Sequence, residues 1–420
     1  MPKHSAILKR GTSILAAAAI LITGSLSGLA PASIAHANPV KVSRQVGEPL
    51  QEATKLAQAG DNKGALLKLD AADAAAANAQ ERYQIASVRR YVYVQTKAYS
   101  KLAPVLESQL ASGLMPDSEA KTVRRELVQV YDRAGDLTKA INAAKNYINT
   151  YGHDADLSIY VAAKALETKD YKAAAIWSKK AIDGERAASR KAPETWYRIR
   201  MKSAYEGKDM ASYYAAIEDV AAIYPNETYW RALVGKARTE PGYTPERLEL
   251  DEFRVLIAAG VKLTAEEKLG MAESAFEREL SAEALSILEP MEKSGELKAD
   301  ASKAARNQRL LDKAKTDTEA DRKALASIVS EARKKADGQA LANVAEMSLA
   351  FGDAKGAAEL YTAALAKTLD PATAATARLR LGIAQFRAGD VAGAKKTWAS
   401  VKATDGTQDI AKVWTIVAAK

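Results

Sequence analysis

A turn that recurs along the chain constrains its fold more than any other feature of the sequence. The turn is a Gly-Asp or Lys-Asp pair between two apolar-patterned segments, at residues 60–61, 135–136, 169–170, 208–209, 352–353 and 389–390. An alanine follows four residues after most of these aspartates, at Ala65, Ala140, Ala174, Ala357 and Ala394. Weaker matches at Leu102, Tyr213, Leu250, Ala284 and Ala320 complete a series with steps of 34 to 39 residues. A fixed period of this size is typical of an array of paired helices.

Residues 117–151 illustrate the helical pattern of one such unit. Their first stripe of apolar side chains recurs at intervals of three and four residues, at Val123, Leu127, Val130 and Tyr131. A second stripe follows the Gly-Asp pair, at Leu137, Ile141, Ala144 and Ile148. This spacing predicts two amphipathic helices joined by a tight turn. Because almost every segment has the same pattern, we expect an all-α fold.

The C-terminal part of the chain carries the motif that identifies the repeat type. Residues 377–405 place Leu381-Gly382, Gly389-Asp390, Ala394 and Trp398 in one register, which resembles the tetratricopeptide repeat (TPR). Gln385 stands where that family has a tyrosine. The resemblance extends from about Pro49 onward, is good over 117–184 and 340–405, and is poor from 241 to 335, where the turn glycine is missing. It implies a right-handed superhelix, an α-solenoid of about nine or ten antiparallel helical hairpins.

The first 37 residues have the pattern of a secretory signal peptide. Lys3, Lys9 and Arg10 precede an apolar stretch over 14–22, and Ala35-His36-Ala37 resembles a cleavage site before Asn38. A membrane anchor is the alternative, but the stretch is short for about 30 Å of hydrocarbon. The chain has no cysteine, so it offers neither a lipidation site nor a disulfide. We therefore expect an exported protein, in a bacterial periplasm, without a membrane anchor after cleavage.

Breaks in the pattern predict the domain boundaries. We expect a signal peptide over 1–37, a flexible leader over 38–48, TPR-like repeats over 49–240, divergent helical repeats over 246–336, and TPR repeats with a capping helix over 337–420. Glu240 to Pro245 is the strongest breaker cluster. Residues 298–335 contain no aromatic residue, and we interpret them as a long solvated helix or a helix pair.

Residues suited to catalysis or metal binding are scarce. His153 is the single histidine beyond the expected leader, beside Asp154 and Asp156, and no HExxH or Gly-rich phosphate motif is present. We expect no catalytic residue, no metal and no cofactor. The alternative is a cell-wall or polysaccharide-active enzyme on a helical scaffold, which would need a pocket where carboxylates of raised pKa converge.

The resemblance to TPR proteins also implies a binding surface on the inward face of the first helix of each hairpin. Its register places a basic and aromatic set there, and the residues predicted to bind a partner are Arg125, Arg198, Lys202, Tyr205, Arg231 and Arg238. Guanidinium groups bind carboxylates through paired hydrogen bonds. The formal charge is +9, or +6 without the leader's three basic residues, so we expect an acidic protein or peptide or an anionic polysaccharide, and no nucleic acid.

The last hairpin differs from the others because its inward positions are apolar. Leu379, Ile383 and Phe386 occupy them, and residues 409–418 form an amphipathic segment that could cap them. A docking site or a dimer contact is the alternative. Together these features predict an exported, non-enzymatic scaffold that acts in envelope assembly, secretion or polysaccharide export. The alternatives to that role are the enzyme above and an oligomeric assembly factor.

Overall fold

The computed structural model describes residues 42–419, and this part of the chain divides into two compact units, which meet in the sequence between Tyr213 and Tyr214. The described residues form twenty α-helices and one short 3₁₀-helix. Apart from an isolated bridge between Asp337 and Thr368, this part of the chain has no β-structure. The all-α prediction is therefore confirmed, and each unit is described by itself below.

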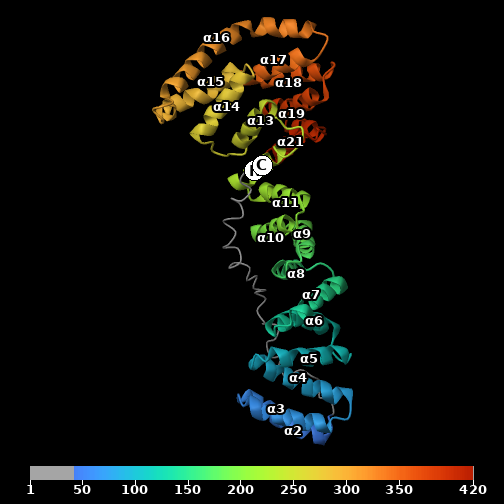
Figure 1. The fold of residues 1–420 in the computed structure, drawn as a ribbon. Coiled ribbons are helices and arrows are strands. Elements are labelled where there is room, and N and C mark those ends of the chain that lie inside the picture. The colour runs from blue at the N-terminus through green and yellow to red at the C-terminus, as the bar shows by residue number, and fades with distance from the viewer. Residues whose placement is uncertain (1–41, 420) are drawn as a thin grey trace. The chain divides into compact units, whose positions relative to one another are not determined.

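Unit 1 is a succession of helices in which each helix packs against its neighbours along the chain (Figure 1). Its helices are α2 (Arg44–Gln58), α3 (Asn62–Ala75), α4 (Ala79–Gln95), α5 (Tyr99–Ala111), α6 (Asp117–Arg133), α7 (Leu137–Tyr151), α8 (Ala155–Glu167), α9 (Tyr171–Ala187) and α10 (Glu194–Glu206). The boundary between the units falls within α11 (Met210–Ile223).

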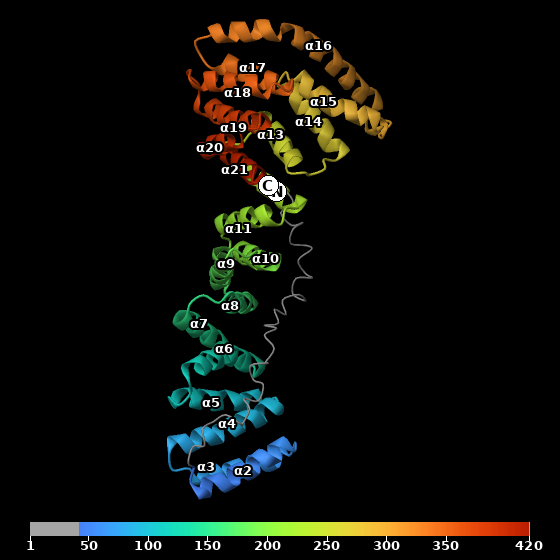
Figure 2. The same cartoon turned by 180° about the vertical axis from the view of Figure 1, so that it is seen from behind.

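Unit 2 combines hairpins with one long helix. Its helices are α12 (Glu227–Ala237), α13 (Pro245–Ala258), α14 (Ala265–Glu277), α15 (Ser281–Lys293), η3 (Glu296–Lys298), α16 (Ala304–Lys334), α17 (Gln339–Ala350), α18 (Ala354–Leu365), α19 (Pro371–Arg387), α20 (Val391–Ala399) and α21 (Thr407–Val417). The last helix, α21, packs against α12 and α13, and Figure 2 shows it beside α19 and α20. The end of this unit therefore meets its beginning.

The recurrent turn has the same geometry at every predicted position. Gly60, Gly135, Gly352 and Gly389 have φ between +82° and +89°, and Lys169 and Lys208 also have positive φ. Glycine suits this left-handed conformation because it has no Cβ. The aspartate that follows is the N-cap of the next helix in each case; Asp136, for example, accepts a hydrogen bond from the Lys139 amide at 3.0 Å.

The small residues of the motif lie where helices approach most closely. Ala65, Ala140, Ala174, Ala357 and Ala394 are all fully buried. A Cβ on Gly382 would lie 2.2 Å from Nε1 of Trp398, so only glycine fits against that indole ring. The predicted hairpins are thus confirmed. The alanine and glycine positions are small because the two helices of a hairpin pack closely there.

One of the weaker sequence matches is wrong. Ala320 is exposed in the middle of α16, a single helix of 31 residues, so no hairpin turn occurs there. The interpretation of residues 298–335 as one long helix is the correct one. Elsewhere in the poorly matching stretch, Glu279 takes the left-handed conformation (φ 59°) and Leu280, which has no side-chain acceptor, precedes α15. That turn lacks the Gly-Asp pair, so the repeated motif could not predict it.

The predicted segment boundaries differ from the structure at two places. Helix α2 begins at Arg44, so residues 44–48 of the expected flexible leader are helical. The Pro241-Gly242 breaker lies inside unit 2, where the Gly242 carbonyl accepts a hydrogen bond from Arg247 at 2.9 Å. The signal peptide and its cleavage before Asn38 lie outside the described residues. None of the helices within 42–419 has the length and hydropathy to cross a membrane.

The predicted capping helix is confirmed. Helix α21 covers the apolar residues of the last hairpin, and Leu379 and Ile383 are fully buried. The Trp414 ring stacks on Trp398 with 5.6 Å between centroids and meets the edge of Phe386 at 5.8 Å. The surface that the docking and dimer alternatives required is therefore covered by the chain itself.

Candidate functional site

The arginine predicted to bind a partner from α6 is engaged within unit 1. Nε of Arg125 donates to Asp154 at 2.9 Å, and Nη2 lies 3.3 Å from Asp156. Asp154 is also the N-cap of α8, so the ion pairs join one hairpin to the next. Burial opposes the charge of Arg125, but the hydrogen bond and charge of Asp154 outweigh it and raise its pKa. The side chain thus stabilises the stack of hairpins.

The predicted arginine within α12, Arg231, and the one that caps its C-terminus, Arg238, are engaged in the same way within unit 2. Arg231 donates to Glu227 at 2.8 Å and to Glu267 at 2.5 Å, and Glu267 belongs to the capping box of α14. Arg238 donates to Glu252 of α13 at 2.8 Å. Both arginines therefore link α12 to the helices that follow it.

The predicted residues of α10 lie together but offer little free charge. Nη2 of Arg198 donates to Glu194 one turn earlier at 3.0 Å, and the Tyr205 ring contacts Tyr213 with 5.6 Å between centroids. Lys202 is half-buried. All four predicted arginines thus have a carboxylate partner within their own unit. A partner-binding role for the set of six stays a prediction.

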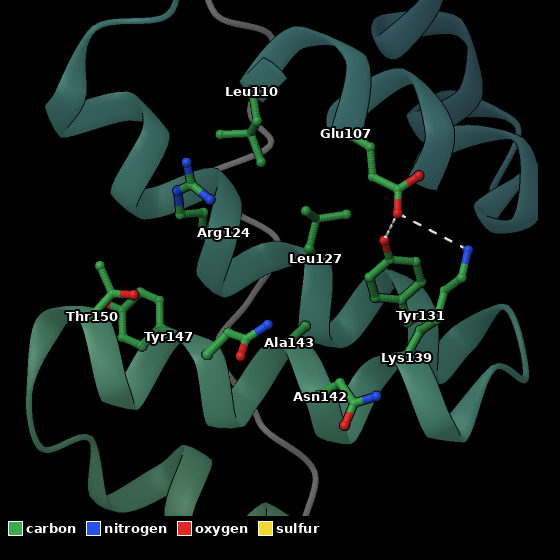
Figure 3. Close-up of a pocket in the computed structure, with 11 residues that line it drawn as sticks. Glu107, Leu110, Arg124, Leu127, Tyr131, Lys139, Asn142, Ala143, Tyr147 and Thr150 are labelled. Atoms are coloured by element: carbon green, nitrogen blue, oxygen red, sulfur yellow. Dashed lines mark hydrogen bonds and ion pairs between the residues drawn. The ribbon is translucent and has the colours of Figure 1, made fainter. Parts of the chain in front are cut away.

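An open groove in unit 1 offers groups that the fold does not use. It is a pocket of about 310 Å³ between α5, α6 and α7 (Figure 3). Its floor is apolar, from Leu110, Leu127, Ala143 and the nearly buried Tyr147. Its volume falls at the lower end of the range of roughly 300–1,000 Å³ for ligand sites.

One end of the groove is neutralised by the protein. There the Tyr131 hydroxyl donates to Glu107, and Nζ of Lys139 lies 4.0 Å from the same carboxylate (Figure 3). Burial, first, and the hydrogen bond to Glu107, second, raise the pKa of Tyr131, so this hydroxyl stays protonated. The acid and the base at this end therefore offset each other.

The remainder of the groove carries uncompensated positive charge and unused amides. Arg124 is exposed, and no carboxylate of the described residues pairs with it. Asn142, Asn146 and Thr150 lie along α7 on the opposite wall, exposed and without a hydrogen-bond partner in the described structure. This wall belongs to a helix, residues 137–151, that has two lysines and no acid.

The groove is lined by the neighbour of an arginine that the sequence predicted to bind a partner. The prediction selected Arg125, whereas the neighbouring Arg124 lines the groove, because consecutive residues of a helix point about 100° apart. The absence of acids between residues 137 and 151 was the available signal.

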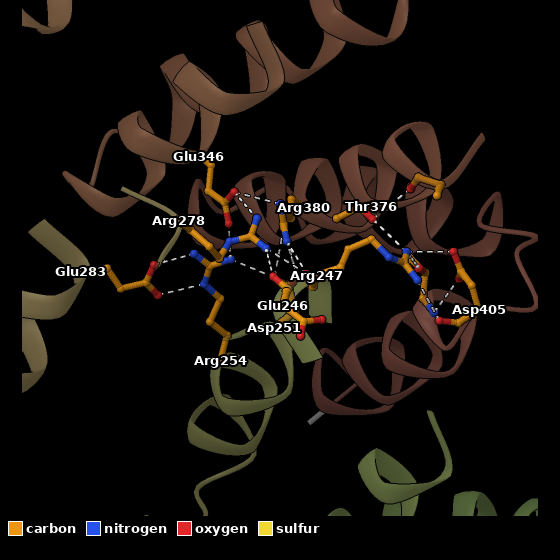
Figure 4. A network of polar contacts seen from close by, with 12 residues as sticks. Glu246, Arg247, Asp251, Arg254, Arg278, Glu283, Glu346, Thr376, Arg380 and Asp405 are labelled. Carbon is orange, nitrogen blue, oxygen red and sulfur yellow. Dashed lines mark hydrogen bonds and ion pairs between the residues drawn. The ribbon is translucent and has the colours of Figure 1, made fainter. Parts of the chain in front are cut away.

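Unit 2 contains a second polar feature, a buried ionic network (Figure 4). Arg254 of α13 pairs with Asp251 at 2.8 Å, Glu346 of α17 at 3.0 Å, and Glu283 of α15. Arg380 of α19 pairs with Asp251 at 2.9 Å and with Glu346 at 2.8 Å. Each of these five side chains is less than 10 % exposed. The network joins helices that are up to 129 residues apart in the chain.

The arginines of this network keep its carboxylates ionised. Burial opposes ionisation of Asp251 most strongly, but Arg380, Arg254 and Arg278 outweigh it and hold the pKa of Asp251 well below its usual range. The same balance lowers the pKa of Glu346. These carboxylates converge, yet their pKa values move away from those of a general acid. The enzyme alternative needs converging carboxylates with raised pKa values, and this network does not provide them.

His153, the single histidine among residues 42–419, lies against a helix of the next hairpin. A Cβ on Gly184 of α9 would meet the His153 ring at 1.6 Å, so this glycine makes room for the imidazole. No cluster of three or more His, Asp or Glu side chains with metal-binding geometry occurs among residues 42–419.

Comparisons with known proteins give likenesses of fold. No family model and no curated protein matches this sequence. Similar solved structures include Naa15/Naa10 bound to HypK-THB, with 15% identity over 86% of this chain and a TM-score of 0.26. The TPR domain of P58(IPK) has 16% identity over 82% of this chain and 98% of its own, with a TM-score of 0.20. Yeast Tom70 has 11% identity over 89% and 95%, with a TM-score of 0.19.

The chain spans 58% of the length of the first of these structures. With identities and TM-scores this low, the repeat type is assigned from the hairpins themselves. Left-handed residue, N-cap aspartate and buried alanine recur with the spacing of the TPR motif, most completely at residues 377–405. The resemblance to TPR repeats is thereby confirmed as a TPR-like helical fold.

Proposed function

We propose that this protein is a non-enzymatic scaffold that binds a segment of a partner protein in the groove between α5, α6 and α7. The observation that carries the proposal is the open groove itself, with an apolar floor and walls of amide and guanidinium groups that have no partner within the described structure. Polar groups left unused by a fold are available to a ligand, and an apolar floor adds the burial that holds a peptide.

Site-specific crosslinking tests the binding role directly. A photoreactive residue in place of Asn146 should crosslink in cells to one segment of a discrete protein, identified by mass spectrometry. The matched control is Lys396, which is exposed on α20 in unit 2. Crosslinking from neither position, or equally from both, would contradict a binding role for the groove.

We also propose that the protein is exported and works in the cell envelope, in assembly, secretion or polymer export. The basic start, the apolar stretch and the Ala-His-Ala site support this proposal. Cell fractionation with intact-mass measurement tests it. The expected result is an envelope-fraction chain that begins at or near Asn38, and a cytoplasmic chain of full length would overturn it.

A further inference from the structure

The charge of the groove specifies the partner further, if the proposed binding function holds. Lys121 and Arg124 lie one helical turn apart on α6 and share a face. Both are exposed, and neither has a carboxylate partner among residues 42–419. Lys121 lies over the Tyr151 ring, 5.4 Å from its centroid, at the α7 end that carries Thr150. Arg124 lines the groove, and Lys121 is a second cation beside it, next to the wall that carries Thr150.

The acidic residues nearest in sequence to these two cations form ion pairs with a different arginine. Glu119 and Glu126 are on the same helix, and both point to Arg90 of α4, at 3.1 and 3.4 Å. Arg89 of α4 is likewise paired with Asp73, at 2.5 Å. Lys121 and Arg124 thus differ from Arg89, Arg90 and Arg125, which all pair with carboxylates.

The opposite wall has the spacing of a peptide backbone. Asn142 and Asn146 are four residues apart on α7, which corresponds to about 6 Å along a helix. Two residues of an extended chain span about 6.6 Å. Each asparagine amide has both a donor and an acceptor, so the two can pair with backbone groups of residues two apart on an extended segment.

We propose that the groove binds an extended acidic peptide segment in which two carboxylates are two residues apart and have apolar neighbours. Residues i and i+2 of an extended chain point to the same side, and their spacing matches that of Lys121 and Arg124. The apolar neighbours contact Leu110 and Leu127 on the floor. This floor favours a peptide over an anionic polysaccharide, which presents hydroxyl groups along its length.

Binding of defined probes to the full-length protein tests this inference. The first probe is a fluorescein-labelled peptide, Gly-Leu-Glu-Leu-Glu-Leu-Gly, the second its Gln-for-Glu counterpart, and the third a labelled oligogalacturonate. Fluorescence anisotropy should show that the acidic peptide binds at least about tenfold more tightly than its Gln counterpart, because charge-assisted bonds are the stronger ones. This affinity should fall as salt rises.

Variants of the two cations locate the binding. Arg124→Gln should weaken binding of the acidic peptide about fivefold to tenfold, and Lys121→Glu with Arg124→Glu should abolish it. The control Arg309→Gln removes an exposed arginine of α16 that has no partner in the described structure, and it should change nothing. Circular dichroism verifies helicity, and Asn146→Ala, which keeps all charges, should weaken both peptides equally.

The outcomes separate this inference from the proposed function. Equal binding of the two peptides, an unchanged affinity in Arg124→Gln, or tighter binding of the oligogalacturonate would overturn the inference. If the photoreactive residue at position 146 still crosslinks to a protein segment in any of these cases, the binding function is supported and the acidic specificity is excluded. If crosslinking also fails, both fall.

Discussion

The two units use the same hairpin in different ways. In unit 1, each helix packs against helices close to it in the chain, and its ion pairs, such as Arg125 with Asp154, are partly exposed. In unit 2, α21 returns to α12 and α13, and a buried network joins α13, α15, α17 and α19. A repeat array can therefore either leave polar groups open to a partner or use them to hold its own ends together.

The difference follows from where the charges lie on the helices. The unused cations of unit 1 lie on an exposed face of α6, where water solvates them at little cost. Asp251, Arg254 and Arg380 of unit 2 are buried, so an unpaired charge at any of them would be costly. Each of them therefore has to be paired, and the pairing fixes which helices meet.

Removing one member of the buried network should produce the largest difference in stability between the two units. Arg254→Ala leaves Asp251 and Glu283 buried without this partner and should destabilise unit 2 by about 3–5 kcal/mol. Arg125→Ala in unit 1 should cost about 1 kcal/mol or less, because that pair is partly exposed. Hydrogen exchange of the full-length chain, followed by mass spectrometry, measures both. Equal losses would mean that the network does not hold unit 2 together.

Acid should destabilise unit 2 before unit 1. Asp251 and Glu346 have folded-state pKa values below those of the unfolded chain, about 4, so their stabilisation is complete above that pH and is lost as pH falls through the folded values. In unit 1, burial raises the pKa of Glu126, so protonation there acts in the opposite direction. Hydrogen exchange between pH 6 and 3 should show unit 2 opening first; unit 1 opening first would contradict this ordering.

The close contact of the last hairpin predicts an effect of intermediate size. Gly382→Ala places a methyl group 2.2 Å from Trp398 Nε1, whose hydrogen bond to Leu379 is 3.0 Å long, and should cost about 1–3 kcal/mol. Gly270→Ala is the matched control, since it meets no atom within 4 Å in α14 and should stabilise by about 0.5–1 kcal/mol. Thermal unfolding monitored by circular dichroism compares them. The same sign for both changes would exclude the packing explanation.

The recurrent turn should behave alike in both units, with the smallest effect. Asp136→Ala in unit 1 and Asp353→Ala in unit 2 each remove an N-cap bond, of 3.0 and 2.9 Å, and should each cost about 1 kcal/mol. Local exchange at the start of α7 and of α18 measures the loss. A cost that differs several-fold between the two would show that the turns are not equivalent.

The sequence predicted the local structure well because the determinants are local. Asp136 caps α7 through an amide three residues away, and Gly382 meets Trp398 of the same hairpin. The closure of unit 2 could not be predicted in this way, because Arg380 and Asp251 are 129 residues apart. The choice of Arg125 over Arg124 failed for a related reason. Both are basic residues of one helix, and only the position of Asp154 on another hairpin decides which one is engaged.

If the peptide binds in unit 1 while the ionic network keeps unit 2 closed, one measurement shows both most directly. Hydrogen exchange of the full-length protein is compared with and without a saturating concentration of the Glu-containing peptide. We predict slower exchange confined to α5, α6 and α7, with unit 2 unchanged. Slower exchange in unit 2, or none anywhere despite measured binding, would contradict the account.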